Sequence, residues 1–185
     1  AKKLQKVLNQ KVEELKLSGI QDSVNMNNFH WYSTSGFIDL EKTKKLNTEH
    51  IFRIGSVTKI FTAAIIMKLW EKDKISLEDT MDKWIPDYPN ADIITIYQLL
   101  NHSSGIYNYT NSLVNNLKNI LFTEKNWDPN NLLKSTYDKK LNFQPGSSHK
   151  YSNTNYLILG LIIEKITGKS LSKIYDNYLF KPMKL

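Results

Sequence analysis

Serine followed three positions later by lysine can place a nucleophile beside a base, and this sequence contains that spacing three times. The three pairs are Ser56 with Lys59, Ser147 with Lys150, and Ser170 with Lys173. The chain has 15 serines and 24 lysines among its 185 residues. With those numbers, roughly two such pairs are expected by chance. The spacing alone therefore does not identify a site, and the surrounding residues must do so.

The first pair differs from the other two in its surroundings. Ser56 and Lys59 open a stretch in which apolar residues cover nearly every face of a helix, a pattern typical of a buried helix. Residues three apart on a helix share a face, so the hydroxyl and the amine can come within hydrogen-bond reach. Apolar neighbours such as Val57 and Ile60 would lower the pKa of Lys59 until the amine can accept the serine proton. The N–H groups of the helix N-terminus would favour an oxyanion beside Ser56.

An alternative interpretation makes Ser56 the N-cap of the helix and Lys59 a surface side chain that reaches water. On these two residues alone, both interpretations stay open. The lysines of the other pairs have an easy path to water, because Ser147 follows Pro145-Gly146 in a loop and Ser170 begins a polar-faced helix. Ser56 and Lys59 are therefore the candidate nucleophile and base.

A second polar group follows the same Pro145-Gly146 loop, where the sequence runs Tyr151-Ser152-Asn153 before another apolar stretch. A nearby ammonium would favour the phenolate form of Tyr151 and let the phenol carry protons. Asn153 offers one acceptor and two donors, enough to hold a lysine amine on one side and a substrate amide on the other. The alternative is a loop tyrosine followed by a helix N-cap near Asn153.

These residues need elements that hold them, and the hydrophobic periodicity indicates a mixture of helices and strands. Apolar residues from Ile60 to Trp70 predict a central helix buried on all sides. The other predicted elements are an amphipathic helix over 2–17 closed by Gly19, two strands over 24–39 turning at Asn27-Asn28, a capping pattern over 76–79, a short helix over 96–100, short surface helices within 108–142, a helix over 156–166 ended by Gly168, and a helix over 170–180 that stops at Pro182.

Composition excludes several function classes. The net charge is +7, but only Arg53 is arginine and the lysines are dispersed, so we expect no nucleic-acid partner. With no cysteine and no two histidines four residues apart, we expect no disulfide, no metal site and no cofactor. The longest stretches of apolar or small residues, 60–67 and 156–163, have 8 residues each. A membrane span needs about 20, so we expect no transmembrane segment.

Three segments, in order along the chain, resemble the motifs of the penicillin-recognising serine hydrolases. This family includes class C β-lactamases, D-alanyl-D-alanine carboxypeptidases and related esterases. Residues 52–62 resemble the S-x-x-K segment, residues 99–106 the L-L-x-H-x-S-G segment, and residues 143–156 carry the Y-x-N segment. Three ordered matches are far more specific than any one of them, and the resemblance covers roughly residues 45–182.

The resemblance implies a mixed α and β, β-lactamase/transpeptidase-like fold, in which a helical region and an antiparallel sheet flanked by helices enclose the site. It makes Ser56 the acylated nucleophile, Lys59 the adjacent base, Tyr151 the proton-transfer partner, and Asn153 a contact to substrate and to Lys59. The loop around His102 is structural in such proteins. The implied substrate is a β-lactam, a D-Ala-D-Ala peptide or an ester, and the family resemblance implies action outside the cytoplasm, after export.

The sequence departs from the family at one point. Relatives carry a third motif, K-T-G or H-x-G, on a later strand that also supplies the second oxyanion N–H, and none of the 34 residues after Tyr151 spells it. We therefore expect residues 1–185 to form a single, incomplete domain without its C-terminal strands. It would be the N-terminal part of a longer protein or a truncated protein, with a C-terminal segment as the partner that completes the sheet. Loss of one oxyanion donor costs about 100- to 1,000-fold in rate.

The leading hypothesis is a serine hydrolase that transfers acyl groups through an ester on Ser56. Two alternatives remain open on the sequence: a small-ester hydrolase on the same scaffold, and a non-catalytic binding or structural remnant whose site is incomplete. The leading hypothesis and the small-ester hydrolase differ in substrate. The non-catalytic remnant differs from both because it forms no acyl-enzyme.

Overall fold

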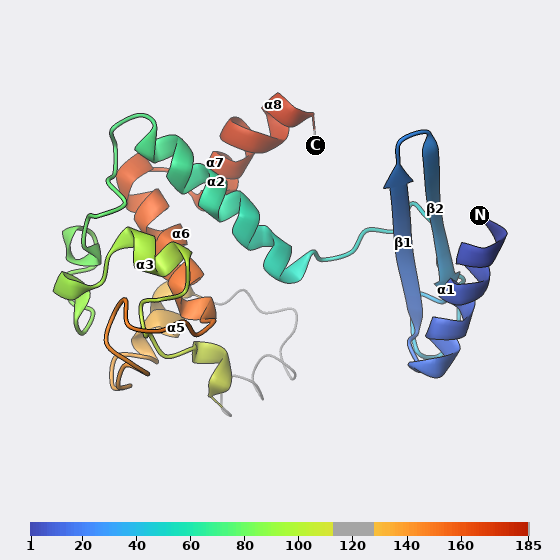
Figure 1. Ribbon diagram of the computed structural model, residues 1–185, viewed down its shortest axis with the longest axis horizontal. Coiled ribbons are helices and arrows are strands. Elements are labelled where there is room, and N and C mark those ends of the chain that lie inside the picture. Colours follow the sequence, from blue (N-terminus) through green and yellow to red (C-terminus); the bar gives the residue numbers. More distant parts are fainter. Residues whose placement is uncertain (113–127, 185) are drawn as a thin grey trace. The chain divides into compact units, whose positions relative to one another are not determined.

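The computed structural model describes residues 1–112 and 128–184 (Figure 1). The chain divides into two compact units, Ala1–Ile54 and Gly55–Leu185. The prediction that residues 1–185 belong to one domain remains a prediction.

The first unit consists of a helix and a hairpin. α1 (Lys2–Glu14) precedes β1 (Gly19–Met26) and β2 (Phe29–Gly36). The strands pair antiparallel, with Gly19 opposite Gly36 and Met26 opposite Phe29. Figure 1 shows α1 lying along the hairpin, and its Leu8 is buried together with Trp31 of β2. The predicted helix, strand pair and turn at Asn27-Asn28 are confirmed.

The boundaries within this unit differ from the prediction. The helix ends at Glu14 rather than at residue 17, because Lys16 adopts a left-handed φ of 52° that a helix cannot continue. Gly19 does not close the helix but begins β1, five positions before the predicted start. A Cβ at Gly19 would lie 2.4 Å from the carbonyl oxygen of Phe37, so this close approach of two backbones requires glycine.

The second unit is helical in its described part. Its helices are α2 (Thr58–Trp70), α3 (Ile96–Leu100), α5 (Pro129–Lys134), α6 (Asn153–Thr167), α7 (Leu171–Tyr175) and α8 (Lys181–Met183). A π-helical turn, Asp176–Phe180, joins α7 to α8, and 3₁₀ turns occupy Gly55–Val57, Met81–Lys83, Ala91–Ile93 and Tyr109–Asn111. α6 packs against α2, α3, α5 and α7 and forms the centre of the unit.

The core of this unit is made of branched aliphatic side chains from the helices around α6. The largest fully buried ones include Ile65, Ile66, Leu99, Ile158 and Ile162. Burying such side chains is the main favourable term in folding. It fixes α2 against α6, and this contact brings together segments nearly 100 residues apart in the sequence.

The prediction that α2 is buried on all sides is wrong. One face, which carries Ile65, Ile66 and Leu69, is buried, whereas Ile60 is 68% and Met67 is 38% exposed. Among the described helices, α6 and α7 pack against the buried face. In α2, apolar residues therefore occur on every face of the helix, but only one face is buried in the described part of the chain.

The start of α3 and the end of α6 follow the sequence, whereas two other predicted boundary signals have a different role in the structure. α3 begins with a capping box, in which Thr95 and Gln98 bond each other's backbone N–H groups, and α6 ends at Gly168, whose φ of 64° is left-handed. The capping pattern over 76–79 instead closes a turn, with the Asp79 carboxylate accepting from the Ser76 N–H at 2.8 Å. Pro182 does not stop the last helix but lies in the first turn of α8, where a missing N–H costs nothing.

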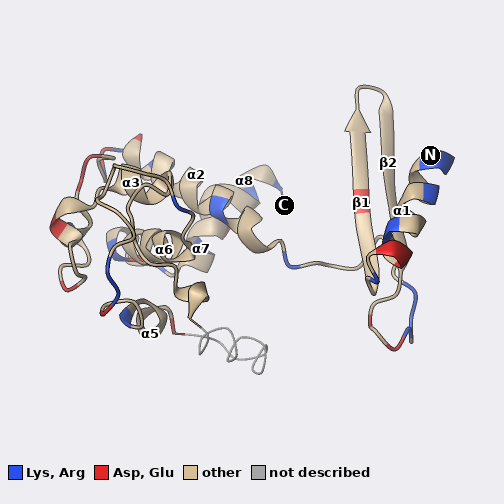
Figure 2. Ribbon diagram, turned by 60° about the horizontal axis from the view of Figure 1, so that its bottom comes forward, with Lys and Arg blue, Asp and Glu red and all other residues tan. Residues whose placement is uncertain are grey.

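Part of the predicted surface-helix region, residues 113–127, lies outside the described residues. The flanking parts of this region, Tyr109–Asn111 and α5, are short helices as predicted. Figure 2 shows that Lys and Arg occur in both units and are interspersed with Asp and Glu.

Candidate active site

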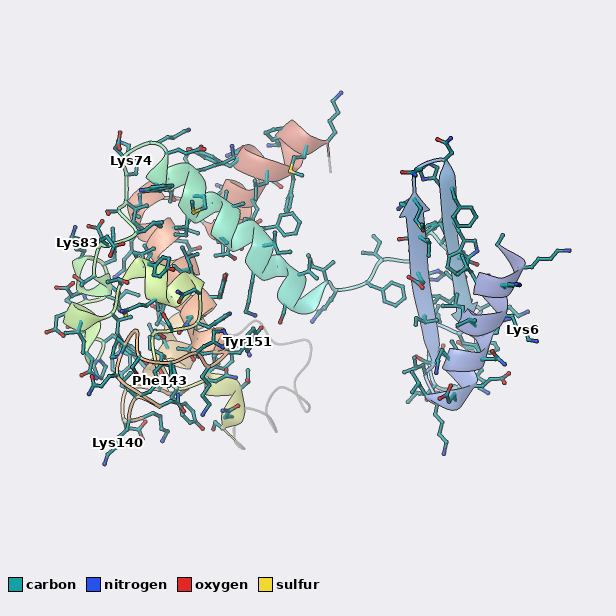
Figure 3. The ribbon with its side chains drawn as sticks, in the orientation of Figure 1. Lys6, Lys74, Lys83, Lys140, Phe143 and Tyr151 are labelled. Carbon is teal, nitrogen blue, oxygen red and sulfur yellow. The ribbon has the colours of Figure 1, made fainter. Side chains whose placement is uncertain are left out.

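The four candidate residues come from two helix starts. Ser56 lies in the 3₁₀ turn Gly55–Val57, which continues into α2, and Lys59 is in the first turn of α2. Tyr151 precedes α6 by one loop residue, Ser152, and Asn153 is the first residue of α6. Because α2 and α6 pack together, their N-terminal ends meet, and Tyr151 can be followed beside them in Figure 3.

The side chains form one hydrogen-bonded group. Lys59 Nζ lies 3.2 Å from Ser56 Oγ and donates to Asn153 Oδ1 at 2.8 Å. Ser56 Oγ and the Tyr151 hydroxyl are 2.9 Å apart, and Tyr151 also donates to Asn153 Oδ1 at 3.3 Å. All four sequence-predicted residues are therefore brought together, across a sequence separation of 95 residues between Ser56 and Tyr151.

The other two serine–lysine pairs have different surroundings. Ser147 Oγ donates to the carbonyl of Gln144 at 2.7 Å, and Lys150 Nζ donates to Asn142 Oδ1 at 2.6 Å, so each side chain of the pair is engaged elsewhere. Ser170 is the N-cap residue of α7, and Lys173 is exposed. Within the part of the chain that the structure describes, Ser56 and Lys59 are therefore the serine–lysine pair whose two side chains hydrogen-bond to each other.

Lys59 has different neighbours from those the sequence suggests. Val57 and Ile60, expected to surround it, point outward and are 52% and 68% exposed. The amine instead faces aromatic rings, 5.0 Å from the ring centre of Tyr151 and 5.7 Å from that of Tyr156, where a cation is attracted by the ring faces. Polar and aromatic groups, not aliphatic ones, thus define the environment of this amine.

The phenol of Tyr151 is poised to exchange a proton. Partial burial alone would raise its pKa, but hydrogen bonds from Lys59 and Ser56, together with the positive charge of Lys59, outweigh this effect and lower the pKa. A phenol with a lowered pKa beside the serine hydroxyl can accept and return a proton more readily than a free tyrosine.

Sequence reasoning missed the residues that hold Asn153. Its side-chain Nδ2 donates to Thr110 Oγ1 at 3.2 Å, and its backbone N–H donates to Asn108 Oδ1 at 3.1 Å. The first contact fixes the amide orientation, so that Oδ1 faces Lys59. Both partners lie more than 40 residues before Asn153 in an Asn-rich stretch, and no local pattern in the sequence marks them.

We expect Thr110→Val to slow the reaction at Ser56 about fivefold, since one hydrogen bond between neutral groups contributes roughly 1 kcal/mol. Valine keeps the shape of threonine but cannot accept from Asn153 Nδ2, so the amide is free to turn away from Lys59. The rate of covalent modification of Ser56 measures the effect. Thr48→Val, the same substitution at an exposed position of the first unit, is the matched control, and equal rates in Thr110→Val and wild type would contradict the positioning role.

A cavity of about 270 Å³ adjoins Lys59 and Asn153 and is lined by residues of α2, α6 and α7. Its walls include Leu157, Leu161 and Leu171 beside the hydroxyls of Thr62 and Tyr175, which hydrogen-bond at 2.7 Å.

Within residues 1–112 and 128–184, no group of three or more His, Cys, Asp or Glu side chains could hold a metal ion. No helix in these ranges is long and apolar enough to cross a bilayer.

The fold and the hydrogen-bonded serine–lysine–tyrosine group define a class of protein. Residues 4–185 match the family described as Beta-lactamase, and the chain belongs to this family. Its fold is β-lactamase/transpeptidase-like, mixed α and β and partial, which confirms the family and fold class predicted from the motifs.

Among curated relatives, penicillin-binding protein 4* of Bacillus subtilis (strain 168) is 31% identical over 160 residues, which are 82% of this chain and 33% of the relative. Teichoic acid D-alanine hydrolase of Staphylococcus aureus is 30% identical over 150 residues, 81% of this chain and 35% of the relative. A solved D-stereospecific amidohydrolase from Streptomyces sp. is 30% identical with a TM-score of 0.84, covering 97% of this chain and 54% of that chain. The chain thus spans about a third of the curated relatives it matches.

Proposed function

We propose that this chain carries the nucleophile of a serine hydrolase that transfers acyl groups through an ester on Ser56. The observation that supports this most directly is the contact of one serine oxygen with two groups that can exchange protons, Lys59 Nζ, which donates to it at 3.2 Å, and the Tyr151 hydroxyl at 2.9 Å. A hydroxyl becomes an effective nucleophile when an adjacent base removes its proton during attack.

In the proposed reaction, Lys59 first gives up a proton to water, and the lone pair of Nζ then accepts the Ser56 proton while Oγ forms a bond to the substrate carbonyl carbon. The carbonyl bond to the leaving nitrogen or oxygen then breaks. Tyr151 passes the proton to that leaving atom, and Asn153 holds Lys59 and a substrate amide. A water molecule later hydrolyses the Ser56 ester and regenerates the hydroxyl.

We infer that the substrate is an ester or amide of a D-amino acid and that it transfers its D-amino-acyl group to Ser56. A β-lactam is a cyclic analogue of such an amide. Support comes from the relatives described above, which are a penicillin-binding protein, a teichoic acid D-alanine hydrolase and a D-stereospecific amidohydrolase. Teichoic acids are polymers of the cell envelope, and we propose action outside the cytoplasm accordingly. The cavity beside Lys59 has room for a small side chain.

The test is mass spectrometry of the intact chain after incubation with benzylpenicillin and, separately, with a D-alanyl p-nitrophenyl ester. The β-lactam should add its whole mass because ring opening releases no fragment, and the ester should add only the D-alanyl group. Trypsin cleaves after Arg53 and Lys59, so fragmentation of peptide 54–59 places the adduct on a single residue. No adduct with either reagent, or an adduct on Ser147 or Ser170, would refute the proposal.

The same measurement separates the alternatives. An adduct that forms and then decays with release of product indicates a hydrolase, and the reagent that turns over distinguishes a β-lactamase from a small-ester hydrolase. A chain that keeps its fold but never acylates under these conditions would support the third alternative, the non-catalytic remnant.

A further inference from the structure

His102 lies against the proposed active site but has no part in the reaction described above. Its ring is tilted by 40° to the ring of Tyr151, with 4.5 Å between their centres, and lies 5.2 Å from the ring of Tyr156. It follows α3 in a loop and has a left-handed φ of 64°. The backbone carbonyl of His102 accepts from the Lys150 N–H at 3.0 Å. One residue thus contacts the Tyr151 loop through both its ring and its backbone.

Two donors point at the same ring nitrogen of His102. The backbone N–H of Ser152 lies 3.3 Å from Nδ1, and Asn155 Nδ2 lies 3.4 Å from it. The amide of Asn155 is fully buried, and its Oδ1 accepts from Ser104 Oγ at 2.8 Å. With its oxygen end bonded to Ser104, the amide turns its NH₂ end to His102, and the backbone N–H of Ser152 can act only as a donor. Nδ1 is therefore an acceptor without a proton, and the neutral ring carries its proton on Nε2.

Protonation of Nδ1 would oppose this arrangement. A proton there would turn two hydrogen bonds into contacts between donors, and would leave the Ser152 N–H without an acceptor directly beside Tyr151. The titratable groups that face the ring are Lys59 on α2, His149 and Tyr151 in the loop before α6, and Tyr156 on α6. Lys59, when charged, and a protonated His149, whose ring centre is 6.1 Å away, would both repel a charged His102.

We propose that neutral His102 is a positioning residue that holds Tyr151 against Ser56, and that protonation of His102 at acidic pH releases this support. The inference rests on the proposed function, since it assigns a role in the reaction of that site. Ser104 and Asn155 act through His102 by fixing the tautomer that accepts from Ser152.

The direction of the pH effect follows from the surroundings of the ring. Burial lowers the pKa of His102 below its ordinary value of 6.5, and the charges of His149 and Lys59 lower it further. The neutral form and its hydrogen bonds are therefore present at neutral pH. They are lost as the pH falls through this lowered pKa.

The experiment combines a spectroscopic titration with kinetics. In long-range ¹H–¹⁵N spectra of the full chain with ¹⁵N-histidine and ¹³C-tyrosine, we expect His102 to be the Nε2–H tautomer at neutral pH and to titrate below 6.5. The ring signals of Tyr151 should shift with the same midpoint. An Nδ1–H tautomer, or Tyr151 signals that stay constant through the His102 titration, would overturn the proposal.

The variant His102→Asn places an oxygen near the position of Nδ1, tolerates the left-handed φ and does not titrate. One pH unit below the wild-type midpoint, only about a tenth of wild-type molecules keep a neutral ring, so the ratio of the variant to the wild-type acylation rate should rise about tenfold between pH 7 and that point. His102→Leu, which offers no acceptor, should be slow at every pH. A constant ratio for His102→Asn would count against the proposal.

His149→Asn is the matched control, because it removes the neighbouring histidine without touching Nδ1. It should leave the coupling between His102 and Tyr151 intact and raise the His102 midpoint, since one repelling charge is gone. The two proposals fail separately. A chain that never acylates at Ser56 refutes the proposed function, whereas the coupled titration of His102 and Tyr151 tests the positioning role without any reaction.

Discussion

Replacement of Ser56 by alanine is expected to abolish the covalent adduct with both benzylpenicillin and the D-alanyl ester. Removal of the nucleophile of a serine hydrolase costs on the order of a millionfold in rate, which puts any residual labelling below detection. The substitution removes one exposed oxygen, so the fold should be unaffected. The measurement is the adduct fraction by intact mass over a time course, with the thermal unfolding midpoint recorded in parallel.

The chain supplies its own controls for this experiment. Ser147→Ala and Ser170→Ala remove the serines of the other two serine–lysine pairs, and both are expected to label at the wild-type rate. The Ser147 hydroxyl donates to the carbonyl of Gln144, and Ser170 stands at the N-cap position of α7 without a side-chain capping bond. Of the three serine hydroxyls, that of Ser56 is the one hydrogen-bonded to its lysine in the described part of the chain. Labelling that persists in Ser56→Ala, or that disappears in either control, would show that a different residue is the nucleophile.

The parts of the fold that could be predicted are those determined by residues close together in the sequence. The apolar stretch that becomes α6 is long and ends at Gly168, and Asn27-Asn28 is a strong turn signal, so these features are found where the sequence puts them. The end of α1 could not be predicted, because it depends on a left-handed Lys16, a conformation that lysine rarely adopts. The exposure of one face of α2 could not be predicted either, since the composition of a helix does not say which elements pack against it.

The candidate site shows the same division. Ser56, Lys59, Tyr151 and Asn153 could be named because motifs fix their types and spacing. Chance alone produces the serine–lysine spacing repeatedly, and coordinates are needed to see which lysine reaches its serine. Partners such as Thr110 contact the site across 43 residues of sequence through single hydrogen bonds. Contacts of this kind depend on tertiary packing and leave no periodic pattern in the chain.

Substitution of Lys59 by methionine is expected to slow acylation of Ser56 by about 100- to 10,000-fold, the usual loss when a general base is removed. Methionine has a similar length and shape but no proton-accepting nitrogen. Lys173→Met and Lys150→Met, at the same position of the other two pairs, should react at the wild-type rate. The pseudo-first-order rate of adduct formation measures all three, and a Lys59→Met rate within a few-fold of wild type would contradict the role as base.

Lys59→Arg separates proton acceptance from positive charge. Arginine keeps the charge but cannot lose its proton at any working pH, so it should be as slow as Lys59→Met if Lys59 is the base. The hydrogen bond and charge of Lys59 also lower the pKa of Tyr151 against the opposing effect of burial. In Lys59→Met that pKa should rise, whereas in Lys59→Arg the retained charge should keep it lower, as tyrosinate absorbance during alkaline titration would reveal. A Lys59→Arg chain that acylates at near the wild-type rate would identify the Tyr151 phenolate as the base, with Lys59 acting only as its neighbouring charge.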